Sequence, residues 1–244
     1  TVVRVSSTET AEMAKLLENT FRFVNISFIN EFALLCDQMG INVWEVVEAA
    51  SSKPFGFKAF YPGPGVGGHC IPVDPIYLQW KAQQLGMESS FIELSTRINR
   101  EMPSYIVSRL QEEMDGSTLA GKRILVLGVT FKEDVADIRE SSVLEVIRLL
   151  MAAGAVVDYH DPLIPKVEIG GTQLLSVELT AERLASSDGV LIAVRHRGLP
   201  LEEVVKHARF VFDTRNAVAG MQGKARIVRL GGGKTGSAQN GISR

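Results

Sequence analysis

Apolar positions in the first part of the chain recur at helical spacing. Residues 8–39 contain no proline or glycine, and their apolar side chains cover much of a helix circumference. Ser7 or Thr8 can cap the first turn and Gly40 can end the last, so the pattern predicts one long core or subunit-contact helix. Three further helices are predicted over residues 43–51, 75–85 and 89–114.

Short continuous apolar runs replace this spacing after residue 117. Runs of strand length, 122–128, 155–159, 189–194 and 209–213, alternate with helical spacing at 141–153 and 179–186. Such alternation predicts βαβ units and a parallel sheet. The predicted fold is therefore α/β, with an all-α region over 1–115 followed by a Rossmann-like parallel-sheet region over 118–230. The low-complexity residues 231–244 are predicted to be a disordered tail.

Composition narrows the class of protein. The 244 residues carry 26 Lys and Arg against 28 Asp and Glu, a formal charge of −2, which argues against a nucleic-acid protein with a broad basic surface. The sequence has no apolar run of membrane-spanning length and no signal-peptide pattern, and its two cysteines are too few for a disulfide scaffold. A cytoplasmic setting is expected. Because the chain starts at Thr1, we also expect it to be a fragment.

A glycine- and proline-rich stretch over 63–75 contains the main candidate chemistry. Its glycines allow a ligand to approach the backbone, and its prolines indicate a defined loop. Cys70 lies beside His69 and four residues before Asp74, so a thiol, an ionisable neighbour and a carboxylate occur together. The alternative is a structural cysteine in a tight turn. Cys36, among apolar residues of the long helix, is expected to be a core side chain.

Other polar residues are candidates through their spacing. Lys15 and Asn19 share a helix face at i, i+4 and could hold an oxyanion, although from the spacing alone a solvated stripe is the better explanation. Gly128 ends a predicted strand, but the G-x-G-x-x-G fingerprint is absent there. The ligand-binding edge of the sheet would instead present Phe131, Lys132 and Arg215, and the two cations suit a diphosphate. The spacing of His, Cys and Asp residues predicts no metal site.

Five motifs together resemble a known family. They are AEMAKLLEN (11–19), ISFINEFALL (26–35), YPGPGVGGHCIPVDP (61–75), GVTFKEDVADIRESS (128–142) and FDTRN (212–216). In this order they resemble the UDP-glucose/GDP-mannose dehydrogenase family, whose members are NAD-dependent four-electron 6-dehydrogenases of nucleotide sugars. The resemblance implies a central helical dimerisation domain and a C-terminal UDP-binding domain. The family's N-terminal NAD-binding domain has no counterpart in these residues, which strengthens the expectation of a fragment.

The resemblance also implies a substrate and partners. Residues 61–75 are most similar to the bacterial UDP-N-acetylhexosamine branch, so UDP-N-acetylglucosamine is the expected substrate, with UDP-N-acetylmannosamine or UDP-glucose as alternatives. The cofactor would be NAD, and the product a uronate for surface-polysaccharide synthesis. The long helix would form a homodimer, and no nucleic-acid or membrane partner is expected.

Residue roles follow only by matching positions to the family's motifs. Cys70 would be the nucleophile that forms a thiohemiacetal and then a thioester, with Lys15 and Asn19 on the oxyanion and Asp74 on the hydrolytic water. Arg139 would reach NAD. The implied substrate-binding residues are Tyr61, Gly63, Gly65, Gly67, Phe131, Lys132 and Arg215.

Two other functions stay open at this point. The chain by itself could be a UDP-sugar-binding and dimerisation module without turnover, since the NAD-binding part is missing. A thiol hydrolase built on Cys70 and His69 is a third class, and it would need an orienting group that the sequence does not identify.

Overall fold

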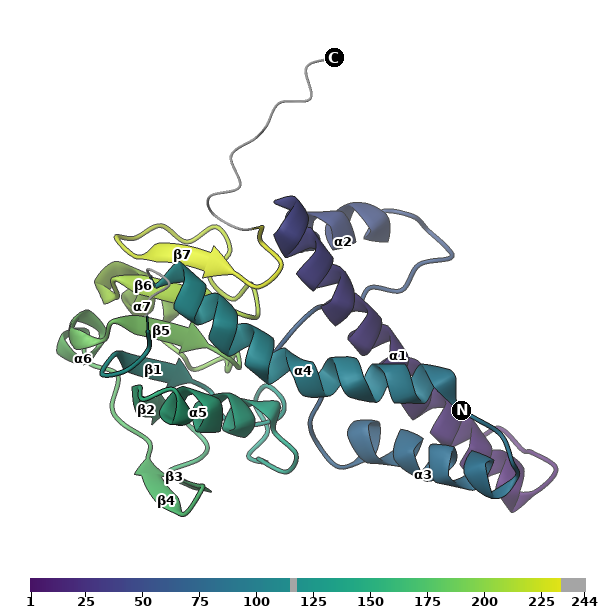
Figure 1. The fold of residues 1–244 in the computed structure, drawn as a ribbon. Coiled ribbons are helices and arrows are strands. Elements are labelled where there is room, and N and C mark those ends of the chain that lie inside the picture. Colours follow the sequence, from purple (N-terminus) through teal and green to yellow (C-terminus); the bar gives the residue numbers. More distant parts are fainter. Residues whose placement is uncertain (115–117, 234–244) are drawn as a thin grey trace.

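The computed structural model describes residues 1–114 and 118–233, and it confirms the predicted α/β class (Figure 1). Four helices come first: α1 (Thr8–Met39), α2 (Val43–Ser51), α3 (Cys70–Gln84) and α4 (Ser90–Glu113). Helix α1 has the predicted bounds because both end signals operate. The Ser7 hydroxyl accepts a hydrogen bond from the Thr10 amide at 3.2 Å, and Gly40 adopts a left-handed φ of 70°. None of the described helices is both long and apolar enough to cross a bilayer.

Helix α3 begins earlier than predicted. The prolines of the glycine-rich stretch suggested a loop up to residue 75, but the helix starts at Cys70. The first four amides of a helix have no intrahelical acceptor, so Pro72 costs no hydrogen bond at the third position. Pro75 lies only just beyond that turn. Cys70 is therefore at a helix N-terminus rather than in a loop, and Asp74 follows it one helical turn later on the same face.

The second half of the described chain is a parallel sheet with helical connections. Its five strands, in the order β2-β1-β5-β6-β7, are all parallel to their neighbours. Along the chain the elements are β1 (Arg123–Leu127), α5 (Ser142–Ala152), β2 (Val156–His160), β3 (Lys166–Ile169), β4 (Thr172–Leu175), α6 (Ala181–Ser186), β5 (Gly189–Ile192), α7 (Leu201–His207), β6 (Phe210–Asp213) and β7 (Arg226–Arg229).

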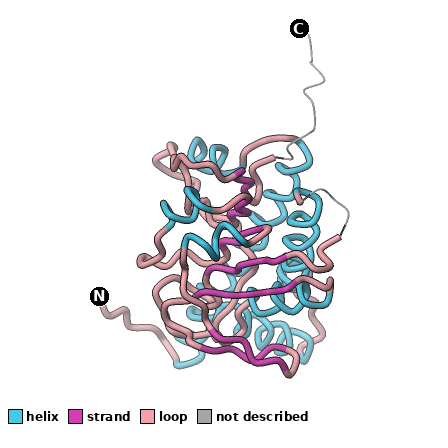
Figure 2. Tube along the Cα trace, turned by 90° about the vertical axis from the view of Figure 1, so that its left-hand side faces the viewer, coloured by secondary structure: helices cyan, strands magenta, loops and turns pink. Residues whose placement is uncertain are grey.

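Alternating side chains of the strands fill two cores, one on each face of the sheet, whose strands are magenta in Figure 2. Ile124 and Val126 of β1 face the core shared with α4 and α5, while Leu125 and Leu127 face the core beneath α6 and α7. Helices therefore cover both faces of the sheet. The antiparallel hairpin β3–β4, helix α7 and strand β7 were not predicted, since each element is short and half of the residues in each of these strands are polar.

Helix α4 belongs to both halves of the molecule. It continues through Pro103, packs along α1 and then ends against the sheet, as Figure 1 shows. Ile106 and Leu110, from its C-terminal half, are fully buried in the same core as the strands. The predicted boundary at residue 115 thus follows the end of α4, but α4 itself packs against the elements on both sides of that boundary.

A buried carboxylate joins the end of the sheet to the first helix. Asp37 of α1 is fully buried and accepts a hydrogen bond from the Tyr105 hydroxyl at 2.7 Å. Its two oxygens also accept from the backbone amides of Gly231 (3.2 Å) and Gly233 (3.0 Å), just beyond β7. The Arg109 guanidinium lies 3.6 Å away and is itself buried.

The contact with Asp37 includes the first residues of the predicted disordered tail, so that prediction started the tail too early. Residues 231–233 are held against α1 and α2, where the Val43 amide also donates to the Gly231 carbonyl at 2.7 Å. A Cβ at Gly231 would collide with the Val43 side chain, and its φ of 69° is left-handed, so glycine is required. The rest of the predicted tail, 234–244, lies outside the described residues.

Replacing Asp37 by Ala should lower the free energy of unfolding by about 3–5 kcal/mol, because the Tyr105 hydroxyl and two backbone amides lose their acceptor and the buried Arg109 guanidinium loses a nearby negative charge. Urea denaturation followed by circular dichroism measures this change. Glu48→Ala, at an exposed site on α2, is the control and should stay within about 0.5 kcal/mol. Equal stability of the two variants would show that Asp37 does not hold the halves together.

Candidate functional site

A pocket of about 170 Å³ lies between the helices and the sheet. The seven residues for which a substrate-binding role was expected all line it, although they come from distant parts of the sequence. They are Tyr61, Gly63, Gly65, Gly67, Phe131, Lys132 and Arg215. Phe131 and Lys132 follow β1, whose neighbours β2 and β5 lie on its opposite sides in the sheet, so the strand order reverses at β1. Open α/β sheets bind ligands at this point of strand-order reversal.

A buried and a half-buried asparagine position the loop that forms one wall of the pocket. We call residues 63–68 the glycine loop. The Asn30 side chain of α1 accepts a hydrogen bond from the Gly63 amide at 2.9 Å, and the Asn99 side chain of α4 accepts one from the Val66 amide at 2.5 Å. Neither asparagine was assigned a role from the sequence. Asn30 gave a weak signal there, as a polar interruption in an apolar helix.

The glycine loop approaches the sheet so closely that side chains would not fit. A Cβ on Gly67 would lie 2.6 Å from the Glu140 carbonyl oxygen and 2.8 Å from Cβ of Phe131. A Cβ on Gly68 would meet the Phe131 ring at 2.7 Å. The Gly68 amide also donates to the Arg139 carbonyl at 3.0 Å. The absence of Cβ atoms therefore allows the loop and the residues after β1 to form one continuous wall.

Arg215 crosses the pocket from the carboxyl end of β6. Its Nε donates to the Ala193 carbonyl at 2.9 Å, and a Cβ on Gly63 would collide with its guanidinium. Burial lowers the pKa of Arg215, and the carboxylates of Glu133 and Asp213 partly offset that effect. Lys132, by contrast, is an exposed cation at the pocket wall. Together they place a fixed and an adaptable positive charge on one cavity, which suits a diphosphate.

The exposed Cys70 lies next to this pocket, because the following residue, Ile71, lines it. The thiol is carried by the first residue of α3, and the N-terminal end of a helix stabilises negative charge. Asp74, one turn later, accepts a hydrogen bond from the Asn19 side chain of α1 at 2.6 Å. The structure therefore groups Cys70, Asp74 and Asn19 at the α1–α3 contact, beside the mouth of the pocket.

Lys15 and Arg139 differ in how they relate to this group. Lys15 lies on the exposed face of α1, with its Nζ 3.3 Å from a carboxylate oxygen of Glu18. In this arrangement its amine pairs with α1 itself rather than with Asn19. The Arg139 guanidinium pairs with Asp137 at 2.7 Å, and Asp137 and, more weakly, Cys70 raise its pKa. Arg139 is therefore a largely exposed cation within electrostatic reach of the thiol.

Metal ligands are not gathered at the site. Among residues 1–114 and 118–233, no group of three or more His, Cys, Asp or Glu side chains has an arrangement that could hold a metal ion. The chemistry that the site supports comes from a thiol, a carboxylate, an amide and two cations.

Family models match most of the chain. The central domain of the UDP-glucose/GDP-mannose dehydrogenase family matches residues 9–101, and the UDP-binding domain of the same family matches residues 125–220. The two matches contain the helices of the Cys70 group and the strands around Lys132 and Arg215.

The individual proteins that are similar to this chain are also nucleotide-sugar dehydrogenases. A UDP-N-acetyl-D-glucosamine 6-dehydrogenase of Pseudomonas aeruginosa is 38% identical over 195 residues, covering 79% of this chain and 46% of that protein. A UDP-N-acetyl-D-mannosamine dehydrogenase of Methanococcus maripaludis is 33% identical over 222 residues, covering 88% and 49%. The solved UDP-D-ManNAc dehydrogenase of Pyrococcus horikoshii superposes with a TM-score of 0.78 at 31% identity, covering 91% and 52%. The chain thus spans about half the length of these relatives.

Proposed function

The chain belongs to the UDP-glucose/GDP-mannose dehydrogenase family, and on that basis we propose that it supplies the UDP-sugar site and the thiol of a UDP-N-acetylhexosamine 6-dehydrogenase. The observation that carries the proposal is the pocket that joins Lys132 and Arg215 to the glycine loop, with Cys70 at its edge. UDP-N-acetylglucosamine is the proposed substrate, with UDP-N-acetylmannosamine and UDP-glucose as alternatives. Turnover would require a dinucleotide-binding domain outside these residues, so the chain alone would bind without oxidising.

The cations and the glycine loop would bind different parts of the substrate. Lys132 and Arg215 would hold the diphosphate, and the Phe131 side chain offers an apolar surface at the same wall. Tyr61 and the glycines at 63, 65 and 67 would lie along the sugar, where close backbone approach favours recognition by shape. In this order, C6 of the sugar would lie at the end of the pocket nearest α3.

Cys70 would carry the covalent part of the reaction. After the first oxidation of the 6-hydroxyl, its Sγ would add to the aldehyde carbon to give a thiohemiacetal. Oxidation of that adduct gives a thioester, and attack by water breaks the C–S bond to release the uronate and the free thiol. Asp74 would orient this water, while Asn19, which fixes Asp74, would also donate to the developing oxyanion with Lys15.

NAD is the proposed hydride acceptor, since the family is NAD-dependent. Within this chain the residue that fits a role toward NAD is Arg139, an exposed guanidinium beside the thiol. A cation in this position suits a pyrophosphate group.

Calorimetric titration of the chain with UDP tests the binding half of the proposal. Replacing Lys132 by Ala should weaken UDP binding by about tenfold to a hundredfold, because a charge-assisted contact to phosphate is lost. Lys122→Ala, at the opposite end of β1, is the matched control and should bind as the wild type does. If the wild type binds no UDP, or if the two variants bind alike, this pocket is not the UDP site.

The covalent half is tested in an enzyme that includes the dinucleotide-binding domain. Cys70→Ala should reduce uronate formation by about 10³-fold or more while leaving UDP-sugar binding essentially unchanged, since only the nucleophile is removed. Uronate and NADH are measured together. Cys36→Ala, which changes the buried cysteine, is the control and should retain turnover. Undiminished uronate formation by the Cys70 variant would exclude the thioester route.

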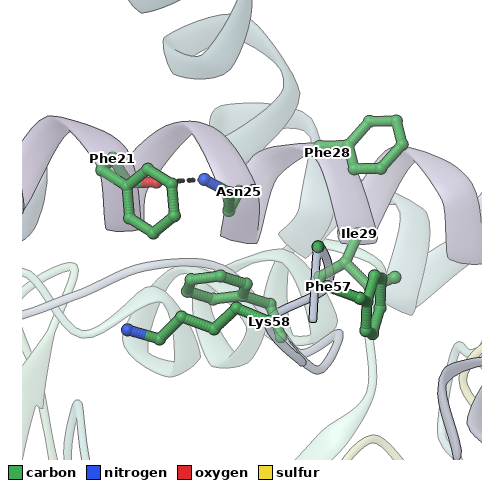
Figure 3. Close-up of a pocket in the computed structure, with 8 residues that line it drawn as sticks. Phe21, Asn25, Phe28, Ile29, Phe57 and Lys58 are labelled. Carbon is green, nitrogen blue, oxygen red and sulfur yellow. Dashed lines mark hydrogen bonds between the residues drawn. The ribbon is translucent and has the colours of Figure 1, made fainter. Parts of the chain in front are cut away.

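We also propose that the chain forms a homodimer through α1. The helix exposes apolar side chains at heptad-related positions, Leu17 (67% exposed), Phe21 (46%), Phe28 (59%) and Leu35 (51%). Phe21 and Phe28 also line a further pocket of about 480 Å³. Figure 3 shows these two side chains together with Phe57, which lines the same pocket. An apolar stripe of this length on one helix can pair with its own copy about a two-fold axis.

Sedimentation velocity tests the dimer. The wild type should sediment at twice the monomer mass at micromolar concentration, and Phe28→Asp should convert it to monomer, because a charge would be buried in an apolar interface. Leu85→Asp is the matched control, since Leu85 is equally exposed (68%) but lies beyond α3. A monomeric wild type, or a dimer that survives Phe28→Asp, would contradict pairing through this stripe.

A further inference from the structure

A buried histidine and aspartate lie directly behind the pocket wall. His196 follows β5 and is 2% exposed, and Asp161 follows β2 and is 3% exposed. Nε2 of His196 is 3.1 Å from Oδ2 of Asp161. Neither side chain lines the pocket between the helices and the sheet, and the proposed reaction uses neither of them. Both face the segment that presents Phe131 and Lys132, residues 129–134, which we call the β1 loop.

The hydrogen bonds of His196 determine its tautomer. Its Nδ1 accepts from the backbone amide of Asp134 at 3.0 Å, so Nδ1 carries no proton. The proton is therefore on Nε2, which faces the Asp161 carboxylate and, at 3.2 Å, the Thr130 hydroxyl. A single imidazole thus links both ends of the β1 loop to the end of β2.

Asp161 anchors the start of the same loop. Its Oδ2 accepts from the Val129 amide at 2.7 Å, and its Oδ1 accepts from the Leu163 amide at 2.8 Å. Burial alone would raise the pKa of Asp161, but the hydrogen bonds from His196, Val129 and Leu163 outweigh it and hold the pKa below its usual value. The carboxylate is therefore a fully engaged acceptor in a buried position.

The far end of the β1 loop is held in an uncommon conformation. Asp134 has a left-handed φ of 57°, which residues other than glycine seldom adopt. Its amide donates to His196, and its carboxylate pairs with the backbone amide and the side chain of Arg197. Between the two ends, the Thr130 hydroxyl donates to the Lys132 carbonyl at 2.8 Å. Each of these bonds fixes the backbone from which Phe131 and Lys132 project.

We propose that His196, oriented by Asp161, is a positioning residue for UDP-sugar binding: it holds the β1 loop so that Phe131 meets the glycine loop and Lys132 faces the pocket. The inference rests on the proposed function, because it assigns His196 to the same site. UDP binding would require the hydrogen bond that Nδ1 of His196 accepts from the Asp134 amide. The hydrogen bond from Nε2 to Asp161 would fix the orientation of the imidazole ring.

Paired substitutions at His196 separate these two bonds. His196→Asn keeps an acceptor near the position of Nδ1 and loses the Nε2 donor, whereas His196→Gln keeps a donor near Nε2 and loses the acceptor. We expect His196→Leu and His196→Gln to weaken UDP binding by about tenfold, the loss of one buried hydrogen bond, and His196→Asn to recover most of the affinity. Titration with UDP is run well below the melting temperature of each variant.

His207→Leu is the matched control, since this histidine pairs with Glu203 within α7 and should leave UDP affinity unchanged. Thr130→Val is the substitute if the His196 variants do not fold. It removes the bond to the Lys132 carbonyl and the 3.2 Å contact with Nε2 of His196, and it should weaken UDP binding several-fold. Wild-type protein that binds no UDP would refute the proposed function itself. If the wild type binds UDP but the Asn and Gln variants bind equally well, or if Thr130→Val binds as the wild type does when the His196 variants do not fold, the positioning role is wrong.

Discussion

The buried contact between Asp37 and the end of the sheet is the constraint on which the site depends. A carboxylate without solvent must have its acceptor capacity used, and here two backbone amides and a tyrosine hydroxyl donate to it, while a guanidinium 3.6 Å away balances its charge. These donors come from α4 and from the segment after β7, so satisfying one side chain of α1 fixes three elements relative to one another. Helix α4 then extends this geometry directly into the core of the sheet.

The pocket is a consequence of that arrangement. Its walls come from both halves of the chain, with the glycine loop held by Asn30 and Asn99 on one side and the β1 loop held by His196 and Asp161 on the other. The contact between the walls leaves no room for a Cβ at Gly67. A relative shift of the halves would therefore separate the cations proposed to bind the diphosphate from the loop proposed to bind the sugar, even if each half stayed folded.

The sequence could predict features whose signals are local. The end signals of α1 and the alternation of strands and helices lie within a few residues of the elements they define, and the motifs between residues 61 and 75 and around Phe131 are contiguous. The start of α3 was wrong because prolines usually break helices, whereas Pro72 falls in the first turn, where its missing amide is not needed. Short elements such as β7 carry too few apolar positions for a period to emerge.

The buried polar partners could not be predicted for a different reason. Asp37 and Gly231 are 194 residues apart, and Asp161 and His196 are 35 residues apart, so no spacing rule connects them. The pairing of Asp161 with His196 arises only when β2 and β5 bring their carboxyl ends to the same edge of the sheet. Lys15 shows the converse: its i, i+4 relation to Asn19 is correct, yet spacing does not determine which way a long side chain turns, and here the amine pairs with Glu18.

The position of Cys70 ties the fold to the proposed chemistry. A thiol at the start of α3 lies where the helix favours negative charge, and Asp74 is brought to the same face by one turn of that helix. Asn19, in the first half of α1, holds Asp74, and Asp37 anchors the C-terminal end of the same helix. The two halves of α1 would thus serve one function: the C-terminal end sets the orientation of the sheet that would bind UDP, and the first half sets the carboxylate beside the thiol. Rigid placement over the length of α1 is what a reaction needs when a nucleotide is bound at one end of a pocket and a sugar carbon is oxidised at the other.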